Sequence, residues 1–263
     1  MEDLTRELGW FWALNQDLLW LSVVCVDLCI TIGMYRLFGK TGLYAVVVLD
    51  IMLGNLVGGT ITTVFGLNTS MGAIIYAGIY FATDLLGEKY GAREANRAVI
   101  LGFAVSLIVT YLGLVCLLFE PTTAPKTAAY ASGMHSALAG LFAVTPRVMI
   151  GSLFAYLVSQ SFDVWMFHYL KRLTNGRHLW LRNNVSTLAS QAIDTALFST
   201  VVWWGFFDFW TAVELAAAKY ALKFVIALLD TPFIYWARSW DVSDKDWEGT
   251  VKQEADRYPL PHA

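Results

Sequence analysis

Long apolar runs recur along the whole chain and are separated by short segments that carry most of the charges. Hydropathy predicts seven helical spans, near residues 18–35, 43–65, 70–87, 98–119, 147–169, 186–207 and 212–237. Most approach the roughly 20 residues that a helix needs to cross a hydrocarbon core about 30 Å thick. Residues 136–146 are moderately apolar and end at Pro146, so we expect a short interfacial or re-entrant piece there. The pattern predicts an all-α integral membrane protein with a bundle of six to seven transmembrane helices.

Composition agrees with a membrane environment. Hydrophobic residues make up 57% of the 263 residues and charged residues 15%, against about 45–50% and about 25% in a typical soluble domain. The net charge of −3 gives no reason to expect nucleic acid as a partner. Cys25, Cys29 and Cys116 lie inside apolar runs, and the four histidines are scattered. We therefore expect no metal centre and no cofactor.

Basic residues divide unevenly between the two sets of loops. The larger set is Arg36, Lys40, Lys89, Arg93, Arg97, Lys171, Arg172, Arg177, Arg182, Arg238, Lys245, Lys252 and Arg257. The opposite set holds only Arg6 and Lys126. Because cytoplasmic loops carry the excess of Lys and Arg, we expect residues 1–17 to be non-cytoplasmic, residues 18–237 to form one transmembrane domain, and residues 238–263 to be a cytoplasmic tail.

Acidic residues occur where a membrane disfavours them. Six aspartates fall inside the predicted spans, namely Asp27, Asp50, Asp84, Asp163, Asp194 and Asp230. A charge at the centre of a spanning helix costs about 2.5–3.5 kcal/mol, so these groups must face a polar interior. At about 1.5 Å per residue, each is expected roughly 5–12 Å from the cytoplasmic end of its helix. The spacing predicts an acidic layer in the inner half, with Lys219 and Lys223 above it.

The fifth and sixth spans contain an internal repeat. Residues 159–167 read Ser-Gln-x-x-Asp-x-x-x-Phe, and residues 190–198 repeat the pattern. Gln and Asp are three residues apart in each copy, so they share a helical face. The two spans run in opposite directions, which predicts a pseudo-two-fold axis in the membrane plane. Many secondary transporters build their substrate sites at such inverted repeats.

The repeat supplies a substrate-site hypothesis built on Gln160, Asp163, Gln191 and Asp194. A carboxylate accepts two parallel N–H bonds, and an amide both donates and accepts, so the set suits a planar ligand such as a guanine edge. Stacking faces could come from Phe167, Phe198, Trp165, Trp203 or Tyr156. Alternatively, the same groups only join the two helices by hydrogen bonds.

Further charged residues are candidates for gating or proton-linked roles, namely Asp84, Glu88, Arg147, Lys223 and Asp230. Asp84 and Glu88 lie one turn apart, which fits either a gate or a capped helix end. Arg147 follows Pro146 at a helix start, where an interfacial anchor and a substrate contact are both open. Gly54-x-x-x-Gly58 predicts close helix packing.

Five segments carry a family resemblance. They are TDLLGEKYG at 83–91 followed by Ala92-Arg93, AYLVSQSFD at 155–163, WLRNNVST at 180–187, SQAIDTALF at 190–198, and Leu229-Asp230-Thr231-Pro232. Together they resemble the bacterial queuosine precursor transporter family, also called the vitamin uptake transporter family, over roughly residues 40–235.

The resemblance implies a multi-pass protein of the cell inner membrane that imports 7-deazaguanine precursors of the modified tRNA nucleoside queuosine. Members lack an ATPase domain, and the family usually has about six spans, so residues 18–35 are an addition. The carried species would be the cyano form, the aminomethyl form or queuine. The protein would lie in the lipid bilayer, and whether it forms a homodimer is left open. Two mechanisms remain, a self-sufficient secondary transporter or a substrate-binding subunit that needs a separate ATPase module. No Ser–His or Cys–His pair or phosphate-binding loop supports an enzyme.

Overall fold

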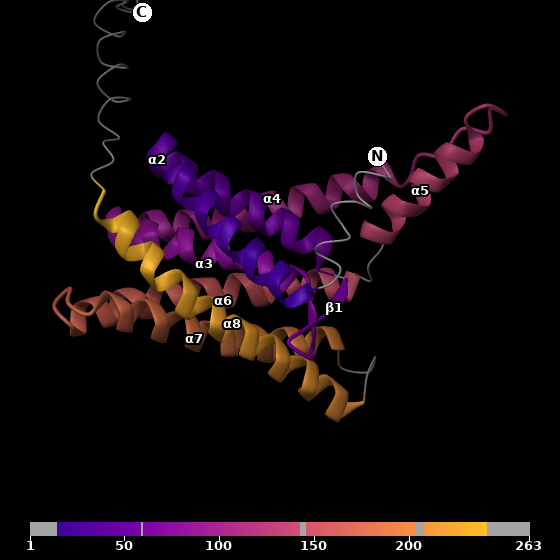
Figure 1. Ribbon diagram of the computed structural model, residues 1–263. Coiled ribbons are helices and arrows are strands. Elements are labelled where there is room, and N and C mark those ends of the chain that lie inside the picture. Colours follow the sequence, from indigo (N-terminus) through magenta and orange to yellow (C-terminus); the bar gives the residue numbers. More distant parts are fainter. Residues whose placement is uncertain (1–14, 59, 143–145, 204–207, 241–263) are drawn as a thin grey trace, which may run out of the picture.

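The computed structural model describes residues 15–58, 60–142, 146–203 and 208–240, with the side chains of 146–150 and 202–203 left aside (Figure 1). The helices are α2 (Gln16–Val57), α3 (Gly72–Lys89), α4 (Ala92–Cys116), α5 (Ala128–Phe142), α6 (Pro146–Leu173), α7 (Leu179–Phe198) and α8 (Phe209–Arg238), with a π turn η1 (Ser199–Trp203) and strands β1 (Ile61–Val64) and β2 (Leu67–Ser70). The predicted all-α membrane bundle is confirmed, with one β-hairpin added.

The first two predicted spans form one element, α2, which is a helical hairpin. Gly39 at its centre has φ 56° and ψ −134°. In a straight helix, Met34 and Gly42 would be about 12 Å apart. Here they lie so close that a Cβ added to Gly42 would collide with the backbone carbonyl of Met34. The chain therefore reverses sharply at Gly39.

The second predicted span ends too late, because its last part belongs to a β-hairpin. The helix stops at Val57, and Ile61–Val64 pairs antiparallel with Leu67–Ser70. Phe65 and Gly66 connect the strands with φ of 50° and 73°, as a two-residue turn with two positive φ angles requires. The predicted helical boundary at 65 is therefore wrong.

Polarity is arranged as a bilayer requires. Two of the described helices, α2 and α4, are long and apolar enough to cross a membrane by length and composition. On α4, large apolar side chains such as Ile100, Ile108 and Leu112 are exposed. The carboxylates of Asp84 and Asp163 are buried instead. This distribution is the reverse of that in a soluble domain.

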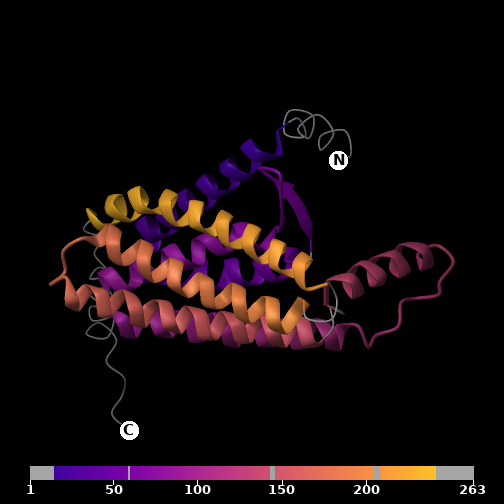
Figure 2. The same ribbon diagram turned by 90° about the horizontal axis from the view of Figure 1, so that it is seen from below.

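Helix α3 lies at the centre of the bundle. Fourteen of its 18 residues are buried, and it packs against α2, α4, α6 and α8. Close packing begins at Gly72, where a Cβ would meet the Gly54 carbonyl and the Gly58 Cα, as the Gly54-x-x-x-Gly58 motif predicts. Helices α6 and α7 lie antiparallel beside it (Figures 1 and 2).

The moderately apolar stretch before the fifth span forms α5, which projects from the bundle (Figure 2). It covers 128–142 rather than 136–146, and none of its residues is buried. The interfacial or re-entrant placement stays a prediction.

Basic residues from the larger set meet at one end of the molecule. Lys40 pairs with Glu94 at 3.2 Å, and the Lys89 ammonium donates to the Trp240 carbonyl at 2.6 Å. Arg36 lies over the Trp240 ring. The α6–α7 turn and the end of α8 lie at this end, opposite the β-hairpin and α5 (Figures 1 and 2).

Candidate functional site

Buried polar side chains gather where α3, α6, α7 and α8 meet. They are Thr83 and Asp84 on α3, Ser159, Gln160 and Asp163 on α6, Asn183, Thr187, Ser190 and Gln191 on α7, and Lys219, Lys223 and Asp230 on α8. On α6, α7 and α8 they recur at spacings of three, four or seven residues, which keeps them on one face of each helix, and Thr83 and Asp84 are adjacent on α3. The predicted polar interior is therefore present.

The repeat in α6 and α7 turns its polar groups inward and toward each other. The Ser190 hydroxyl donates to Asp163 Oδ1 at 2.8 Å, and the Thr83 hydroxyl donates to Gln160 Oε1 at 3.4 Å. Asp163 thus contacts the second copy of the motif beside Gln191. This agrees with the antiparallel register that the repeat predicts.

Two carboxyl groups meet in this interior, and a third, that of Asp230, has an amide partner. Asp84 lies within hydrogen-bond reach of Asp163, and the Thr187 hydroxyl donates to Asp84 Oδ2 at 3.4 Å. Asn183 donates to Asp230 Oδ1 at 2.7 Å. A hydrogen bond between two carboxyl groups requires a proton on one of them, so the Asp84–Asp163 pair can hold a proton.

Asp194 has other partners than the sequence suggests. Lys223 approaches Asp194 Oδ2 at 2.6 Å and Lys219 at 3.6 Å. Helix α7 begins at Leu179 rather than 186, which puts Asp194 roughly 22 Å from the helix start at about 1.5 Å per residue. The predicted place of Asp194 in an acidic layer below the lysines is wrong.

A small cavity opens between α3, α7 and α8. Its lining residues are Ala73, Tyr76, Ala77, Tyr80, Thr187, Gln191, Lys223, Ile226 and Asp230. The empty space is about 240 Å³ when the part open to the surroundings is included, but its enclosed part has room for only about one water molecule. Of the predicted site residues, Gln191, Lys223 and Asp230 line it. Gln160, Asp163 and Asp194 do not line it.

Several buried polar atoms in the described interior have no protein partner. They include Gln191 Oε1 and Gln160 Nε2. A buried polar group left unsatisfied costs about 1–3 kcal/mol. These atoms are therefore positions where water or a ligand would bind.

The aromatic side chains named from the sequence are not those of the cavity. Phe167, Phe198, Trp165 and Tyr156 do not line it, and the side chain of Trp203 lies outside the described residues. Phe167 instead lies under the Arg182 guanidinium, and Phe198 lies under the Lys219 ammonium.

Tyr76 and Tyr80 supply the aromatic surface of the cavity, and sequence reasoning missed them. They lie one turn apart on α3, with Ala73 and Ala77 on the same face. The sequence does contain a signal for this surface, namely two alanines and two tyrosines at helical spacing. A small side chain leaves space beside a large one, so this pattern is typical of a cavity wall.

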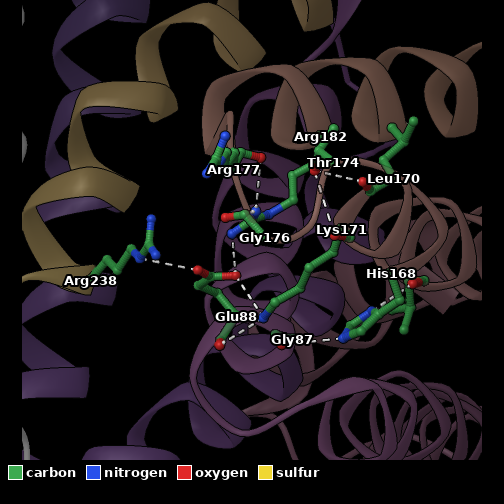
Figure 3. A network of polar contacts seen from close by, with 11 residues as sticks. Gly87, Glu88, His168, Leu170, Lys171, Thr174, Gly176, Arg177, Arg182 and Arg238 are labelled. Carbon is green, nitrogen blue, oxygen red and sulfur yellow. Dashed lines mark hydrogen bonds and ion pairs between the residues drawn. The ribbon is translucent and has the colours of Figure 1, made fainter.

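Glu88 is the centre of an ion-pair cluster at the basic end of the bundle (Figure 3). Its carboxylate pairs with Lys171 at 2.8 Å, Arg182 at 2.5 Å and Arg238 at 3.1 Å. Arg182 is fully buried and also donates to the Gly176 carbonyl at 3.0 Å. The cluster, hereafter the Glu88 cluster, joins α3, α6, α7 and α8. The Arg147 side chain lies outside the described residues.

Comparison with known proteins identifies relatives over most of the chain. Residues 70–237 match a family model described as "Putative vitamin uptake transporter". A "Probable queuosine precursor transporter" of Bacillus subtilis (strain 168) is 34% identical over 229 residues, which are 86% of this chain and 96% of the relative. The "Queuosine precursor transporter" of Escherichia coli (strain K12) is 28% identical over 172 residues, 64% and 71% of the two chains.

A third relative, a "Probable queuosine precursor transporter" of Haemophilus influenzae, is 26% identical over 168 residues, 63% of this chain and 66% of the relative. No solved structure gives a significant match. The family model covers the α3–α8 interior and includes Glu88, Lys171 and Arg182 of the Glu88 cluster. The chain therefore belongs to the vitamin uptake transporter family, in which these relatives are named queuosine precursor transporters.

Proposed function

We propose that this protein imports 7-deazaguanine precursors of queuosine across the bacterial inner membrane. Its relatives carry the name of that activity. The observation that carries the proposal is Gln191, whose buried carbonyl oxygen has no protein partner and which lines the cavity beside Tyr76 and Tyr80. The end bearing the larger basic set is cytoplasmic, so residues 1–17 are outside and residues 238–263 are inside.

The cavity groups complement a guanine edge. The Gln191 carbonyl and the Asp230 carboxylate accept from the ring N–H and the exocyclic amine, and the Lys223 ammonium donates to the ring carbonyl. The rings of Tyr76 and Tyr80 offer faces for stacking. For the aminomethyl precursor, which is a cation, the buried carboxylates add electrostatic attraction.

The other predicted site residues hold this constellation in place. Asp163 accepts from Ser190, the neighbour of Gln191, and Asp194 pairs with Lys223. Gln160 stabilises the α3–α6 contact through Thr83. The enclosed part of the cavity has room for only about one water molecule in this conformation, so entry of a bicyclic base requires movement of α3, α7 and α8.

The Glu88 cluster closes the cytoplasmic side in this arrangement. Its ion pairs join the helices that line the cavity to α6. Release of substrate into the cytoplasm requires these pairs to separate. Rocking of packed helices around a central site is the usual basis of alternating access.

Binding by the purified protein tests the substrate class. We expect cyano- and aminomethyl-7-deazaguanine to bind, with weaker binding of guanine and none of common vitamins. Gln191→Leu removes the acceptor and keeps the volume, so the affinity should fall about tenfold to a hundredfold, the equivalent of about 1–3 kcal/mol. Asn96→Leu makes the same chemical change at an exposed site on α4 and should leave affinity unchanged. Tight binding of a vitamin without binding of 7-deazaguanines would reject the proposal.

Uptake by the lone protein in liposomes tests the mechanism. A secondary transporter should accumulate or exchange labelled precursor with no other protein present. Binding without any transport would instead identify a capture subunit that needs an ATPase module.

A further inference from the structure

A second polar site lies on the far side of α3 from the cavity. Asp27 and Asp50, one on each arm of α2, both approach the backbone of Gly78. The Gly78 N–H donates to Asp27 Oδ2 at 2.9 Å. A Cβ on Gly78 would lie 2.8 Å from Asp27 Oδ2 and would collide with Asp50 Oδ2. The absence of a side chain at Gly78 thus lets two carboxyl groups share one small space.

The two acids are buried and one oxygen is unsatisfied. Asp27 is 9% exposed and Asp50 2%. Asp50 Oδ2, which points at Gly78, has no hydrogen-bond partner. Because both carboxyl groups lie next to the same Gly78 position, two ionised carboxylates there, in a membrane interior, would repel strongly. The unsatisfied oxygen and the missing counter-charge both indicate a bound ligand of positive charge.

Charged groups on the surrounding helices do not supply that charge. The nearby cations are already paired with other carboxylates: Glu88 pairs with the cations of the Glu88 cluster, Glu94 pairs with Lys40 and Arg97, and Asp194 pairs with Lys219 and Lys223. The remaining acids add no positive charge, since Asp84 lies against Asp163 and Asp230 accepts from Asn183. Cys25 and Cys29, on either side of Asp27, are exposed. Within the described residues, no ion pair reaches Asp27 or Asp50.

The donor set favours a proton over a metal cation. One Asp27 oxygen already accepts from an N–H group, and an N–H cannot coordinate a cation. Among the described residues no group of three or more acidic, His or Cys side chains is arranged for a metal ion. We propose that the Asp27–Asp50 pair binds a proton and couples its movement to transport of the substrate. The coupling part rests on the proposed function.

Helix α3 connects the two sites mechanically. Gly78 is two residues from both Tyr76 and Tyr80, so it lies about 200° around the helix from either of them. The acid pair therefore holds one face of α3 while the cavity occupies the other. Protonation lets α2 pack closely on Gly78, and loss of the proton separates the carboxylates. Any shift of α3 that follows moves the cavity wall.

Transport by the full-length protein in liposomes tests the coupling. With the membrane potential clamped at zero, an inward proton gradient of one pH unit should drive up to about tenfold accumulation of labelled 7-deazaguanine for one coupled proton. Asp27→Asn and Asp50→Asn should abolish this accumulation but retain exchange of labelled for unlabelled substrate at equal pH. Asp208→Asn, the same change at an exposed helix cap, should retain both activities.

The outcomes separate the two proposals. Accumulation that ignores the proton gradient, follows a sodium gradient, or survives in both acid-pair variants overturns proton coupling and leaves the proposed function intact. Absence of substrate exchange in the unmodified protein rejects the proposed function instead.

Infrared difference spectra of the substrate-free protein test the proton site itself. A protonated carboxyl band should appear on acidification and be lost in Asp50→Asn. Gly78→Ala forces the two acids apart and should also remove or shift the band. An unchanged band in both variants means that the pair does not bind the proton.

Discussion

Asp163 and Asp194 occupy equivalent positions in the repeat, yet their surroundings differ. Asp163 accepts from Ser190 and lies against Asp84, whereas Asp194 is neutralised by two lysines. The repeat pattern predicts that both side chains face inward, because helical spacing fixes the face. It does not predict Asp84 or the two lysines as their partners, since these come from α3 and α8, whose rotation about their axes depends on packing.

Asp163→Asn is expected to abolish precursor uptake while the protein still folds. Asparagine keeps the shape and can still accept from Ser190, but it removes the acid that lies against Asp84 and so removes the proton-holding pair. Uptake by cells lacking other importers measures the effect, and detergent-solubilised thermal unfolding checks the fold. Ser190→Ala removes only the hydrogen bond and should reduce uptake less. Normal import by Asp163→Asn would mean that the repeat merely joins the helices.

At the scale of elements, hydropathy predicts most helices but misplaces their ends. Hydropathy predicts a start at 186 because Arg182, Asn183 and Asn184 lower the local hydropathy. Helix α7 begins at Leu179 instead, and all three of these side chains are buried. The reversal at Gly39 was expected only as a loop, since a single positive φ has no hydropathy signal. Strands β1 and β2 were missed for a similar reason, because four-residue strands are shorter than any membrane window.

The reversal of α2 depends on glycine at position 39. With φ 56° and ψ −134°, Gly39→Ala should cost about 1–3 kcal/mol of unfolding free energy, as strained backbone positions do. Gly33→Ala lies in the first arm of α2, where an added Cβ meets nothing within 4 Å. This control should be neutral or slightly stabilising. Unfolding in mixed micelles compares the two, and equal stability of both variants would contradict the assigned reversal.

Helix α8 begins with a charged cap whose effect depends on pH. Asp208 accepts from the Thr211 hydroxyl at 2.7 Å and from its N–H at 2.9 Å. These hydrogen bonds lower the pKa of Asp208 below its usual value. A lowered folded-state pKa contributes stability above the unfolded pKa of about 3.9, and this stability is lost as pH falls through the folded pKa. Hydrogen exchange in the first turn of α8 should speed up in acid, and Asp208→Ala should remove that pH dependence.

At the scale of the whole molecule, charge distribution predicted the two ends of the bundle. Lys40, Lys89 and Arg182 of the larger basic set meet at one end, where they bind Glu94 on α4, the Trp240 carbonyl and Glu88 on α3. Their detailed pairing was not predictable, because Arg182 was assigned to a loop and is instead fully buried in α7. The positive-inside pattern therefore also provides the cations that hold the helices together at the proposed cytoplasmic exit.

Opening of that exit should depend on Glu88. Its single carboxylate offsets Lys171, Arg182 and Arg238, so Glu88→Gln leaves three cations that repel one another across α6, α7 and α8. The population with an open cytoplasmic side should increase. In a cysteine-free background, a cysteine at Thr187 in the cavity wall should then react faster with a maleimide applied from the cytoplasmic face.

Glu94→Gln provides the matched control for this opening. Glu94 lies at the same end and pairs with Lys40 and Arg97, but these pairs join α2 to α4 and do not include the helices that line the cavity. Labelling at Thr187 should therefore stay at the unmodified rate in Glu94→Gln. Equal labelling in both variants would show that the Glu88 cluster only stabilises the fold. Faster labelling confined to Glu88→Gln requires that the cluster itself keeps the cavity closed, because the loss of charge is the same at both sites.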